Sequence, residues 1–279
     1  MNYRRLAVLN ETDTWRIWRG EHPSSRKCFT IKEARQGVSA DRLGTQLAAE
    51  YALLSQLDHP HILRPAMLDL DRLRLLYDDT QSTLAGLLQQ VGPLQSDLVA
   101  KVLMQCLEAL AYLHGRKLGH GSLNTRTIYL GPAGEVKLAD FLACRFDEPA
   151  ELRESDSTTR YLAPEMIEPD RGRFSPSSDL YCLGFVALEM LLGGEFERLF
   201  GLDPASWSAQ KSWLDWHADP NRRLANLPQQ VESDRGLLQM IEAMIEKEIP
   251  QRGYRSAAQA IERLQALGLV TSRSLPGMA

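Results

Sequence analysis

The side chains that could do chemistry in this chain gather in two short stretches, 120–130 and 136–142. The first stretch includes an imidazole, an amide and two hydroxyls, at His120, Asn124, Ser122 and Thr127. The second contains Asp140, and a carboxylate is a ligand that Mg²⁺ accepts in proteins. A serine hydroxyl is neither anionic nor basic near neutral pH, so Ser122 offers no general base. Whether this chain is an enzyme depends on these few positions.

The composition is that of an ordinary globular chain without extreme charge. The 279 residues suffice for one large or two modest domains, and 44% of them are hydrophobic and 24% charged. The net charge of −4 gives no electrostatic reason to expect a nucleic acid partner. No run of about 18 apolar residues is present, so no membrane segment is expected. The four cysteines form no C-x-x-C pair, and we expect reduced thiols and a cytoplasmic location.

The pattern of apolar residues divides the chain into a β-rich part, 1–78, a mainly helical part, 79–270, and a tail or start of a linker, 271–279. Clusters of β-forming residues predict strands at 15–18, 28–32 and 72–77. Apolar spacing typical of helices predicts helices at 41–57, 96–114, 179–192, 233–249 and 256–267. The predicted fold class is therefore α+β, with a small sheet lobe before a larger helical lobe.

Short motifs follow one another along these elements. They are Cys-Phe-Thr-Ile-Lys at 28–32, Glu50, His-Pro-His-Ile-Leu at 59–63, His120, Asp140 with Phe141, Thr-Thr-Arg-Tyr-Leu-Ala-Pro-Glu at 158–165, Asp179 with Gly184, and Arg252. In this order they resemble the V-A-I-K, H-R-D, D-F-G and A-P-E signatures of the eukaryotic-type protein kinase family, and bacterial-type Ser/Thr kinase domains more than tyrosine kinases. The resemblance implies one two-lobed kinase domain, with a small antiparallel sheet and one helix in the first lobe.

The resemblance also implies a nucleotide site and assigns residues to it. Lys32 and Glu50 would form the ion pair that positions a phosphate, and Asp140 would be the ligand of one Mg²⁺ ion. The walls of the nucleotide pocket would be Ile17, Thr30, Leu76, Asp78 and Tyr129. Among these, Leu76 would be the gatekeeper at the back of the pocket, followed by Tyr77 and Asp78 at the hinge.

Other matching residues have structural roles in the family. The apolar spine that joins the two lobes would consist of His120, Phe141, Leu54 and Pro65. Glu165 and Arg252 would form an ion pair, and Asp179 would begin the central helix of the large lobe. These residues support the fold and carry no information about the reaction.

Three positions depart from the family pattern where the chemistry depends on them. Ser122 stands where the family has its aspartate base, Asn124 where it has a lysine, and Thr127 where it has the asparagine that holds a second magnesium ion. Losing a positioned general base costs about 10²–10⁴ in rate. The sequence therefore predicts no functional catalytic residue in this loop.

The predicted pocket also differs from that of the family. Residues 10–15 lack the glycines that allow a backbone to approach phosphates, and they include Glu11 and Asp13. These two carboxylates either repel phosphate or point into water. Thr30 replaces a small alanine, and the ring of Tyr129 could fill the cavity.

We therefore expect a pseudokinase, a domain that is not an enzyme and requires no cofactor, with binding of ATP and Mg²⁺ disfavoured. Its function would be to bind another protein, such as an active kinase or another signalling component, as a scaffold or regulator. Two alternatives stay open. One is a weak or atypical Ser/Thr protein kinase that uses Lys32, Glu50 and Asp140 with a borrowed or solvent base, and the other is a sensor that binds ATP without turnover.

Overall fold

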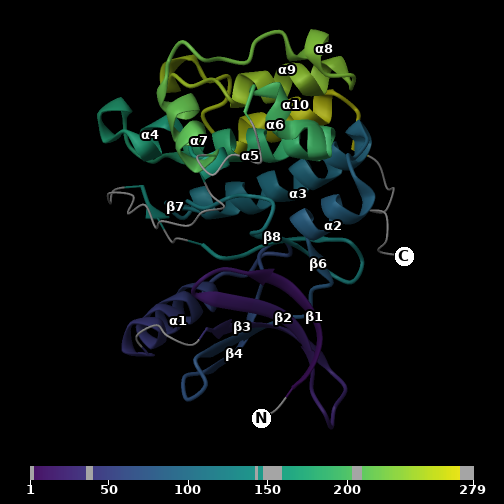
Figure 1. Ribbon diagram of the computed structural model, residues 1–279, viewed down its shortest axis with the longest axis vertical. Helices are drawn as coiled ribbons and strands as arrows, with labels where there is room; N and C mark the ends of the chain where they lie inside the picture. The colour runs from purple at the N-terminus through teal and green to yellow at the C-terminus, as the bar shows by residue number, and fades with distance from the viewer. Residues whose placement is uncertain (1–2, 36–39, 142–143, 147–158, 203–208, 271–279) are drawn as a thin grey trace.

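The structure is a computed structural model, and it describes residues 3–35, 40–141, 144–146, 159–202 and 209–270. Two lobes are stacked along the long axis of the molecule, a sheet-rich lobe that contains the N-terminus and a helical lobe (Figure 1). This arrangement confirms the predicted α+β class, with an antiparallel sheet in the small lobe. The predicted tail, 271–279, lies outside the described residues.

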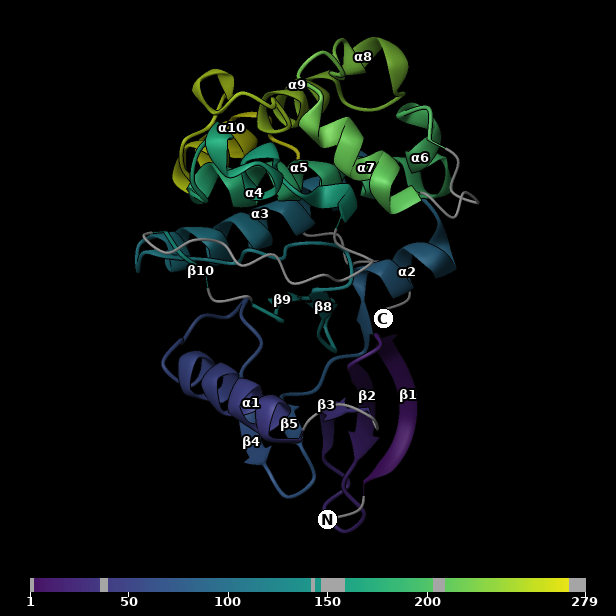
Figure 2. The same cartoon turned by 60° about the vertical axis from the view of Figure 1, so that its left-hand side comes forward.

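The small lobe is built on a five-stranded antiparallel sheet with a helix beside it. Its elements are β1 (Arg4–Glu11), β2 (Trp15–Glu21), β3 (Cys28–Ala34), α1 (Ala40–Leu54), β4 (Pro65–Asp69) and β5 (Arg74–Tyr77). The strand order is β1-β2-β3-β5-β4, so β3 lies at the centre. Helix α1 packs against β4 and β5, and Figure 2 shows it beside these strands.

The pairing register decides which side chains face the other lobe. Lys32 of β3 lies opposite Ile17 of β2 and Leu75 of β5, and Thr30 lies opposite Tyr77. Residues that oppose each other directly point to the same face of a sheet, and neighbours along a strand point to opposite faces. One face therefore carries all five of these side chains. The other face carries a separate buried cluster of Trp18, Ile31 and Leu76.

The large lobe combines helices with short strands. Its helices are α2 (Leu84–Val91), α3 (Ser96–His114), α4 (Pro164–Ile167), α5 (Pro176–Leu192), α6 (Phe196–Leu199), α7 (Ala209–Ala218), α8 (Leu227–Gln230), α9 (Arg235–Met244) and α10 (Ala257–Ala266). Its strands are β6 (Ser82–Thr83), β7 (Leu118–Gly119), β8 (Ile128–Leu130), β9 (Val136–Leu138) and β10 (Cys144–Arg145). Short 3₁₀ turns cover Thr159–Tyr161, Pro169–Arg171, Gly193–Glu195 and Ile249–Gln251. Strands β8 and β9 lie between α3 and the five-stranded sheet (Figure 2).

Helix α5 is the centre of the large lobe. Nearly all of its side chains are buried, Asp179 among them, and it packs against α3 and α9. Its first turn is closed by a capping box, in which the hydroxyls of Ser175 and Ser178 each accept a hydrogen bond from the other residue's backbone N–H. The cap fixes the start of the helix, and with it the position of Asp179.

Two helices end earlier than their apolar spacing predicts. Helix α1 ends at Leu54 although 41–57 has helical spacing, because the last two amides of that range bond to carbonyls three residues back, the pattern of a 3₁₀ turn. The range 233–249 is helical only from Arg235 to Met244, and the chain then continues to a separate 3₁₀ turn at Ile249–Gln251. Among the described helices, none has both the length and the hydrophobicity that crossing a bilayer requires.

Glu165 and Arg252 form a buried ion pair in the large lobe. Two contacts of 2.6 Å join the guanidinium to both carboxylate oxygens, and each side chain is only 1% exposed. The hydroxyl of Ser178 donates to the same carboxylate. This bidentate pair ties α4, which contains Glu165, to the segment between α9 and α10.

Replacing Arg252 with alanine is expected to lower the free energy of unfolding by about 3–5 kcal/mol, because Glu165 would stay buried without a counter-ion. Urea denaturation followed by circular dichroism measures this change. Arg198→Ala is the matched control, since Arg198 pairs with Glu195 at the exposed surface, where an ion pair contributes less than about 1 kcal/mol. Equal losses in the two variants would contradict a structural role for the buried pair.

Candidate functional site

Lys32 is the centre of the candidate site, and it is bonded to two carboxylates at once. Its Nζ lies 2.8 Å from Oε2 of Glu50 and 2.8 Å from Oδ1 of Asp140. Its side chain is nearly buried, with 7% exposed. The ammonium also lies 5.2 Å from the ring centre of Trp15, within cation–π range. The three residues that the resemblance assigns to nucleotide binding are thus brought together.

Each of these three residues is positioned by a neighbouring element. Lys32 lies in β3, the central strand of the sheet. Glu50 lies on α1, three residues after Leu47 and four before Leu54, so it shares the face of the helix that these buried leucines define. Asp140 follows β9 and has a φ of 57°, a left-handed conformation that aspartate adopts more readily than most residues.

Burial and charge act against each other on the ionisable groups of the site. Burial would lower the pKa of Lys32, but the carboxylates of Asp140 and Glu50 outweigh it and raise that pKa above its ordinary value. Burial would raise the pKa of Asp140, but Lys32 and the hydroxyl of Tyr129 outweigh it and keep that pKa below its ordinary value. At neutral pH Lys32 is therefore protonated and Asp140 ionised, the charge states that suit a phosphate and a metal ion.

Two tyrosine hydroxyls complete the polar network. Tyr129 donates to Oδ2 of Asp140 at 2.9 Å, and Tyr77 donates to Oε1 of Glu50. Burial raises the pKa of both phenols and the nearby carboxylates raise it further, so both stay protonated. The network runs from Tyr77 through Glu50, Lys32 and Asp140 to Tyr129. Each charged group in it has a partner, which is the condition for a stable buried network.

The prediction that Leu76 is the gatekeeper is wrong, and Tyr77 takes that place. Leu76 belongs to the cluster on the far face of the sheet, whereas Tyr77 lies opposite Thr30 on the face that carries Lys32. The prediction was off by one residue along β5, and a shift of one residue along a strand moves a side chain to the other face of the sheet. Ile17, another predicted wall residue, lies directly opposite Lys32 and on the same face of the sheet.

A hydrogen bond joins Thr30, a wall residue of the predicted pocket, to Thr80. Their hydroxyl oxygens lie 2.6 Å apart, and the backbone N–H of Thr80 donates to the Thr30 hydroxyl at 3.0 Å. Both residues are fully buried. Asp78 is exposed, and its backbone N–H donates to the carbonyl of Arg64. Thr80 is a site residue that sequence reasoning missed, and Tyr77, predicted at the hinge, lies instead at the site, where its hydroxyl donates to Glu50.

The three altered positions of the loop direct their polar groups to the backbone around them. The Ser122 hydroxyl donates to the carbonyl of Asp140 at 2.6 Å. The Asn124 amide donates to the Ser122 carbonyl and accepts from the N–H of Arg126, both at 2.8 Å. The Thr127 hydroxyl accepts from the N–H of Asn124 at 3.0 Å. Asn124 and Thr127 therefore stabilise the loop, and their polar atoms are used within it.

Glu11, the last residue of β1 before the turn to β2, forms ion pairs with two arginines. The Oε1 atom of Glu11 lies 2.7 Å from Arg16 and 3.5 Å from Arg35. The hydrogen bond from Arg16 keeps the pKa of Glu11 below its ordinary value. Asp13 is exposed. Glu11 and Asp13 are both exposed, as the second alternative expects, and the charge of Glu11 is in addition offset by arginine.

His120, Phe141 and Asp179 attach the loop to the helical lobe. The rings of His120 and Phe141 lie 4.6 Å apart. The Asp179 carboxylate accepts hydrogen bonds from the backbone N–H of His120 at 2.9 Å and of the next residue at 3.0 Å. Burial lowers the pKa of His120 to about 4, so this imidazole is neutral. Leu54 is fully buried, and Pro65 is half-buried opposite Tyr77 in the sheet.

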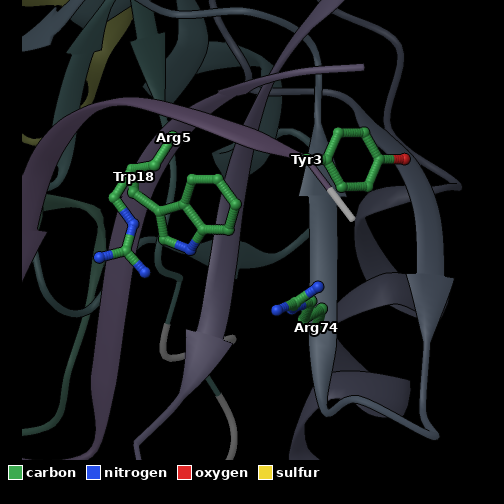
Figure 3. A pocket seen from close by; sticks show the side chains of 4 residues that line it. All are labelled: Tyr3, Arg5, Trp18 and Arg74. Atoms are coloured by element: carbon green, nitrogen blue, oxygen red, sulfur yellow. The ribbon is translucent and has the colours of Figure 1, made fainter. Parts of the chain in front are cut away.

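A cavity of about 230 Å³ lies away from this site, lined by Tyr3, Arg5, Trp18 and Arg74. Figure 3 shows Arg5 beside the indole of Trp18. The guanidinium carbons of Arg5 and Arg74 lie 5.1 Å and 5.9 Å from the ring centre of Trp18. Because Trp18 belongs to the face of the sheet opposite Lys32, this cavity is separate from the candidate site around Lys32.

Comparisons with known proteins agree with this geometry. The family described as protein kinase domain matches residues 16–263. Mitogen-activated protein kinase kinase kinase 9 of Arabidopsis thaliana is 33% identical over 172 residues, which is 59% of this chain and 22% of that protein. Mitogen-activated protein kinase kinase kinase 1 of the same plant is 32% identical over 172 residues, 59% of this chain and 28% of that protein. The chain therefore spans less than a third of these relatives' length.

A relative of another type covers more of the chain. The probable cyclin-dependent kinase 10 of Dictyostelium discoideum is 25% identical over 252 residues, which is 82% of this chain and 67% of that protein. The similarity thus extends across both lobes.

The predictions that this chain is a pseudokinase rather than an enzyme, and that it requires no cofactor, are wrong. The family match and the kinases among the relatives indicate an active protein kinase, and protein kinases use ATP with Mg²⁺. The physical reason is that phosphoryl transfer depends mainly on positioning and charge, which the site around Lys32 retains, while the predictions gave most weight to the missing base. With a match that covers most of its length, the chain belongs to the protein kinase family.

Proposed function

We propose that this chain is the ATP-dependent catalytic domain of a Ser/Thr protein kinase with a low rate of transfer. The observation that carries the proposal is the position of Lys32, whose Nζ lies 2.8 Å from both Glu50 and Asp140. Lys32, which would bind the phosphates, thus lies beside Asp140, which would bind a metal ion. The site is buried, and charges interact strongly there. The acceptor would be the hydroxyl of a serine or threonine in another protein.

The side chains of the site fit a nucleotide with one magnesium ion. Among the described residues, no three His, Cys, Asp or Glu side chains form a cluster that could hold a metal ion. Mg²⁺, however, is commonly held by one or two carboxylates together with substrate phosphates and water. Asp140 supplies such a carboxylate in its ionised form, and Lys32 supplies the partner for the phosphates. When bound, the ion neutralises charge on the phosphates.

The residues of the chain hold and orient the reactants. Lys32 would bind a phosphate oxygen, and Glu50 would keep Lys32 in place. The oxygen of the acceptor hydroxyl forms a bond to the terminal phosphorus while the bond to the leaving ADP oxygen breaks. The hydroxyl proton passes to water or to a basic group of the protein substrate, because Ser122 is not a base. This missing base, worth about 10²–10⁴ in rate, makes transfer slow.

Transfer of labelled phosphate from ATP to a generic protein substrate, or to the chain itself, tests the proposal in the presence of Mg²⁺ or Mn²⁺. We expect the wild type to exceed background. Asp140→Asn keeps the size and removes the charge, and it is expected to abolish transfer. Asp71→Asn, the same change at an exposed position in the small lobe, is expected to leave transfer unchanged.

Two results would contradict the proposed activity. One is a wild type that transfers no phosphate above background, and the other is equal transfer by the wild type and Asp140→Asn, which would identify a contaminating kinase. Thermal melting of both variants shows whether they are folded.

We also propose that the chain forms one kinase domain, with its small lobe at 1–78 and its large lobe at 79–270. The location is the cytoplasm, where ATP is present and thiols stay reduced, consistent with the free thiols of Cys28, Cys106 and Cys182. The partner is a protein substrate or another signalling component, because mitogen-activated protein kinase kinase kinases are among the relatives.

A further inference from the structure

Both carboxylate oxygens of Asp140 are already bonded to side chains of this chain. Oδ1 accepts from Lys32 at 2.8 Å, and Oδ2 accepts from the hydroxyl of Tyr129 at 2.9 Å. The backbone of Asp140 is held as well, since its carbonyl accepts from Ser122 at 2.6 Å. A magnesium ion that approaches this carboxylate therefore meets the phenol on Oδ2.

The phenol cannot easily turn away from Asp140. Tyr129 is the middle residue of β8, lies opposite Thr83 of β6 and Lys137 of β9, and is 1% exposed. A hydrogen bond to a charged acceptor is stronger than one between neutral groups, and burial strengthens it further. The bond between Tyr129 and Asp140 is thus a stable feature of the site.

The rest of the network holds Asp140 from the other side. Tyr77 donates to Glu50, and Glu50 and Asp140 share Lys32. Asp140 therefore cannot swing toward a metal ion without breaking its ion pair with Lys32. Displacement of the Tyr129 hydroxyl from Oδ2 is the smaller change.

We propose that the hydroxyl of Tyr129 is a latch on Asp140: it donates to the carboxylate oxygen that a magnesium ion would take, and it competes with the metal ion for the electron pairs of that oxygen. The proposal rests on the proposed function, because it presumes that ATP and Mg²⁺ bind at Lys32 and Asp140. Because of this competition, the half-saturating Mg²⁺ concentration of this domain is high. Tyr129 acts through Asp140 and is a positioning residue.

The opposite role would have the opposite consequence. If the phenol oriented Asp140 for the metal ion, removing the hydroxyl would weaken metal binding. The sign of the change in metal affinity therefore separates a latch from an orienting group.

Tyr129→Phe tests the latch because it removes the hydroxyl and keeps the ring that fills the core. Thermal stabilisation by ATP is measured across a titration of Mg²⁺, and the fluorescence of Trp15, 5.2 Å from the Lys32 ammonium, gives a second readout of binding. The half-saturating Mg²⁺ concentration is expected to fall about tenfold, the effect of one hydrogen bond to a charged group. Tyr254→Phe, a phenol deletion in the large lobe, is expected to leave it unchanged.

The outcomes separate this inference from the proposed function. A metal-dependent shift in the wild type whose Mg²⁺ requirement is equal or higher in Tyr129→Phe overturns the latch and leaves the proposed function standing. A shift that appears only in Tyr129→Phe supports the latch. No shift in either protein overturns both. Melting without ligand shows that Tyr129→Phe is folded, and adding Asp140→Asn to it is expected to remove the metal dependence.

Discussion

Replacing Ser122 with aspartate is expected to raise the rate of phosphoryl transfer by about 10²-fold or more, the effect of supplying a positioned general base. The side chain at 122 is attached to the site, because its hydroxyl donates to the carbonyl of Asp140 at 2.6 Å. In the protein kinase family, the aspartate at this position of the loop accepts the proton of the acceptor hydroxyl. Single-turnover assays with saturating ATP and Mg²⁺ measure the gain directly.

Ser122→Asn is the matched control for this gain. The asparagine side chain has the size of aspartate and no basic oxygen, so it is expected to leave the rate at or below that of the wild type. An equal increase in both variants would show that the size of the side chain, and not its basicity, limits transfer. The Ser122→Asp variant still has Asn124 and Thr127 where the family has a lysine and an asparagine. It is therefore not expected to reach the rate of a kinase that has all three family residues.

Replacing Lys32 with methionine is expected to lower the free energy of unfolding by about 3–5 kcal/mol at pH 7, because two largely buried carboxylates lose their shared cation. Glu50 and Asp140 would then face each other without compensation. The same variant is expected to lose nucleotide binding, since no other cation of the described site is bonded to both carboxylates.

The effect of Lys32→Met on stability depends on pH in a defined direction. In the wild type the pKa of Asp140 is lowered, so its contribution is present above about pH 4 and is lost as the pH falls further. The pKa of Lys32 is raised, so its contribution is present below about pH 10 and is lost above the raised pKa. In the variant, burial of Asp140 is no longer offset by Lys32 and favours its protonation, so acid stabilises the variant relative to the wild type.

Urea unfolding of both proteins at pH 7 and at pH 4 measures this dependence. The difference in free energy of unfolding is expected to be largest at pH 7 and to shrink at pH 4. A difference that stays constant with pH would mean that lost packing of the lysine stem, and not lost charge, causes the destabilisation.

The parts of the fold that local spacing determines could be predicted from the sequence. The spacing of leucines along α1 places Glu50 on the buried face of that helix, and β-forming residues around Lys32 identify β3. The resemblance of the ordered motifs to the kinase family then implies that Lys32, Glu50 and Asp140 meet. The first two inferences use only neighbours along the chain, whereas the third depends on the family.

Features that depend on contacts between distant segments could not be predicted in the same way. The last three residues of β5 are all buried, so both faces of the strand are apolar and the sequence has no alternation to separate Leu76 from Tyr77. The bond between Thr30 and Thr80 joins positions 50 residues apart and depends on strand pairing.

The error about enzyme activity has a different cause. Ser122, Asn124 and Thr127 are changes of residue type that a sequence displays directly, whereas the buried network around Lys32 appears only when the lobes are assembled. A missing base lowers a rate by a limited factor. It does not remove the charges that position the phosphates.

The ion pair between Lys32 and Asp140 joins the two lobes, since Lys32 belongs to the sheet of the small lobe and Asp140 follows β9 of the large lobe. A rotation that moves the lobes apart at this point must break the ion pair. The strength of the pair therefore adds to the free energy of opening the lobes, and a variant that lacks either charge is expected to open more readily.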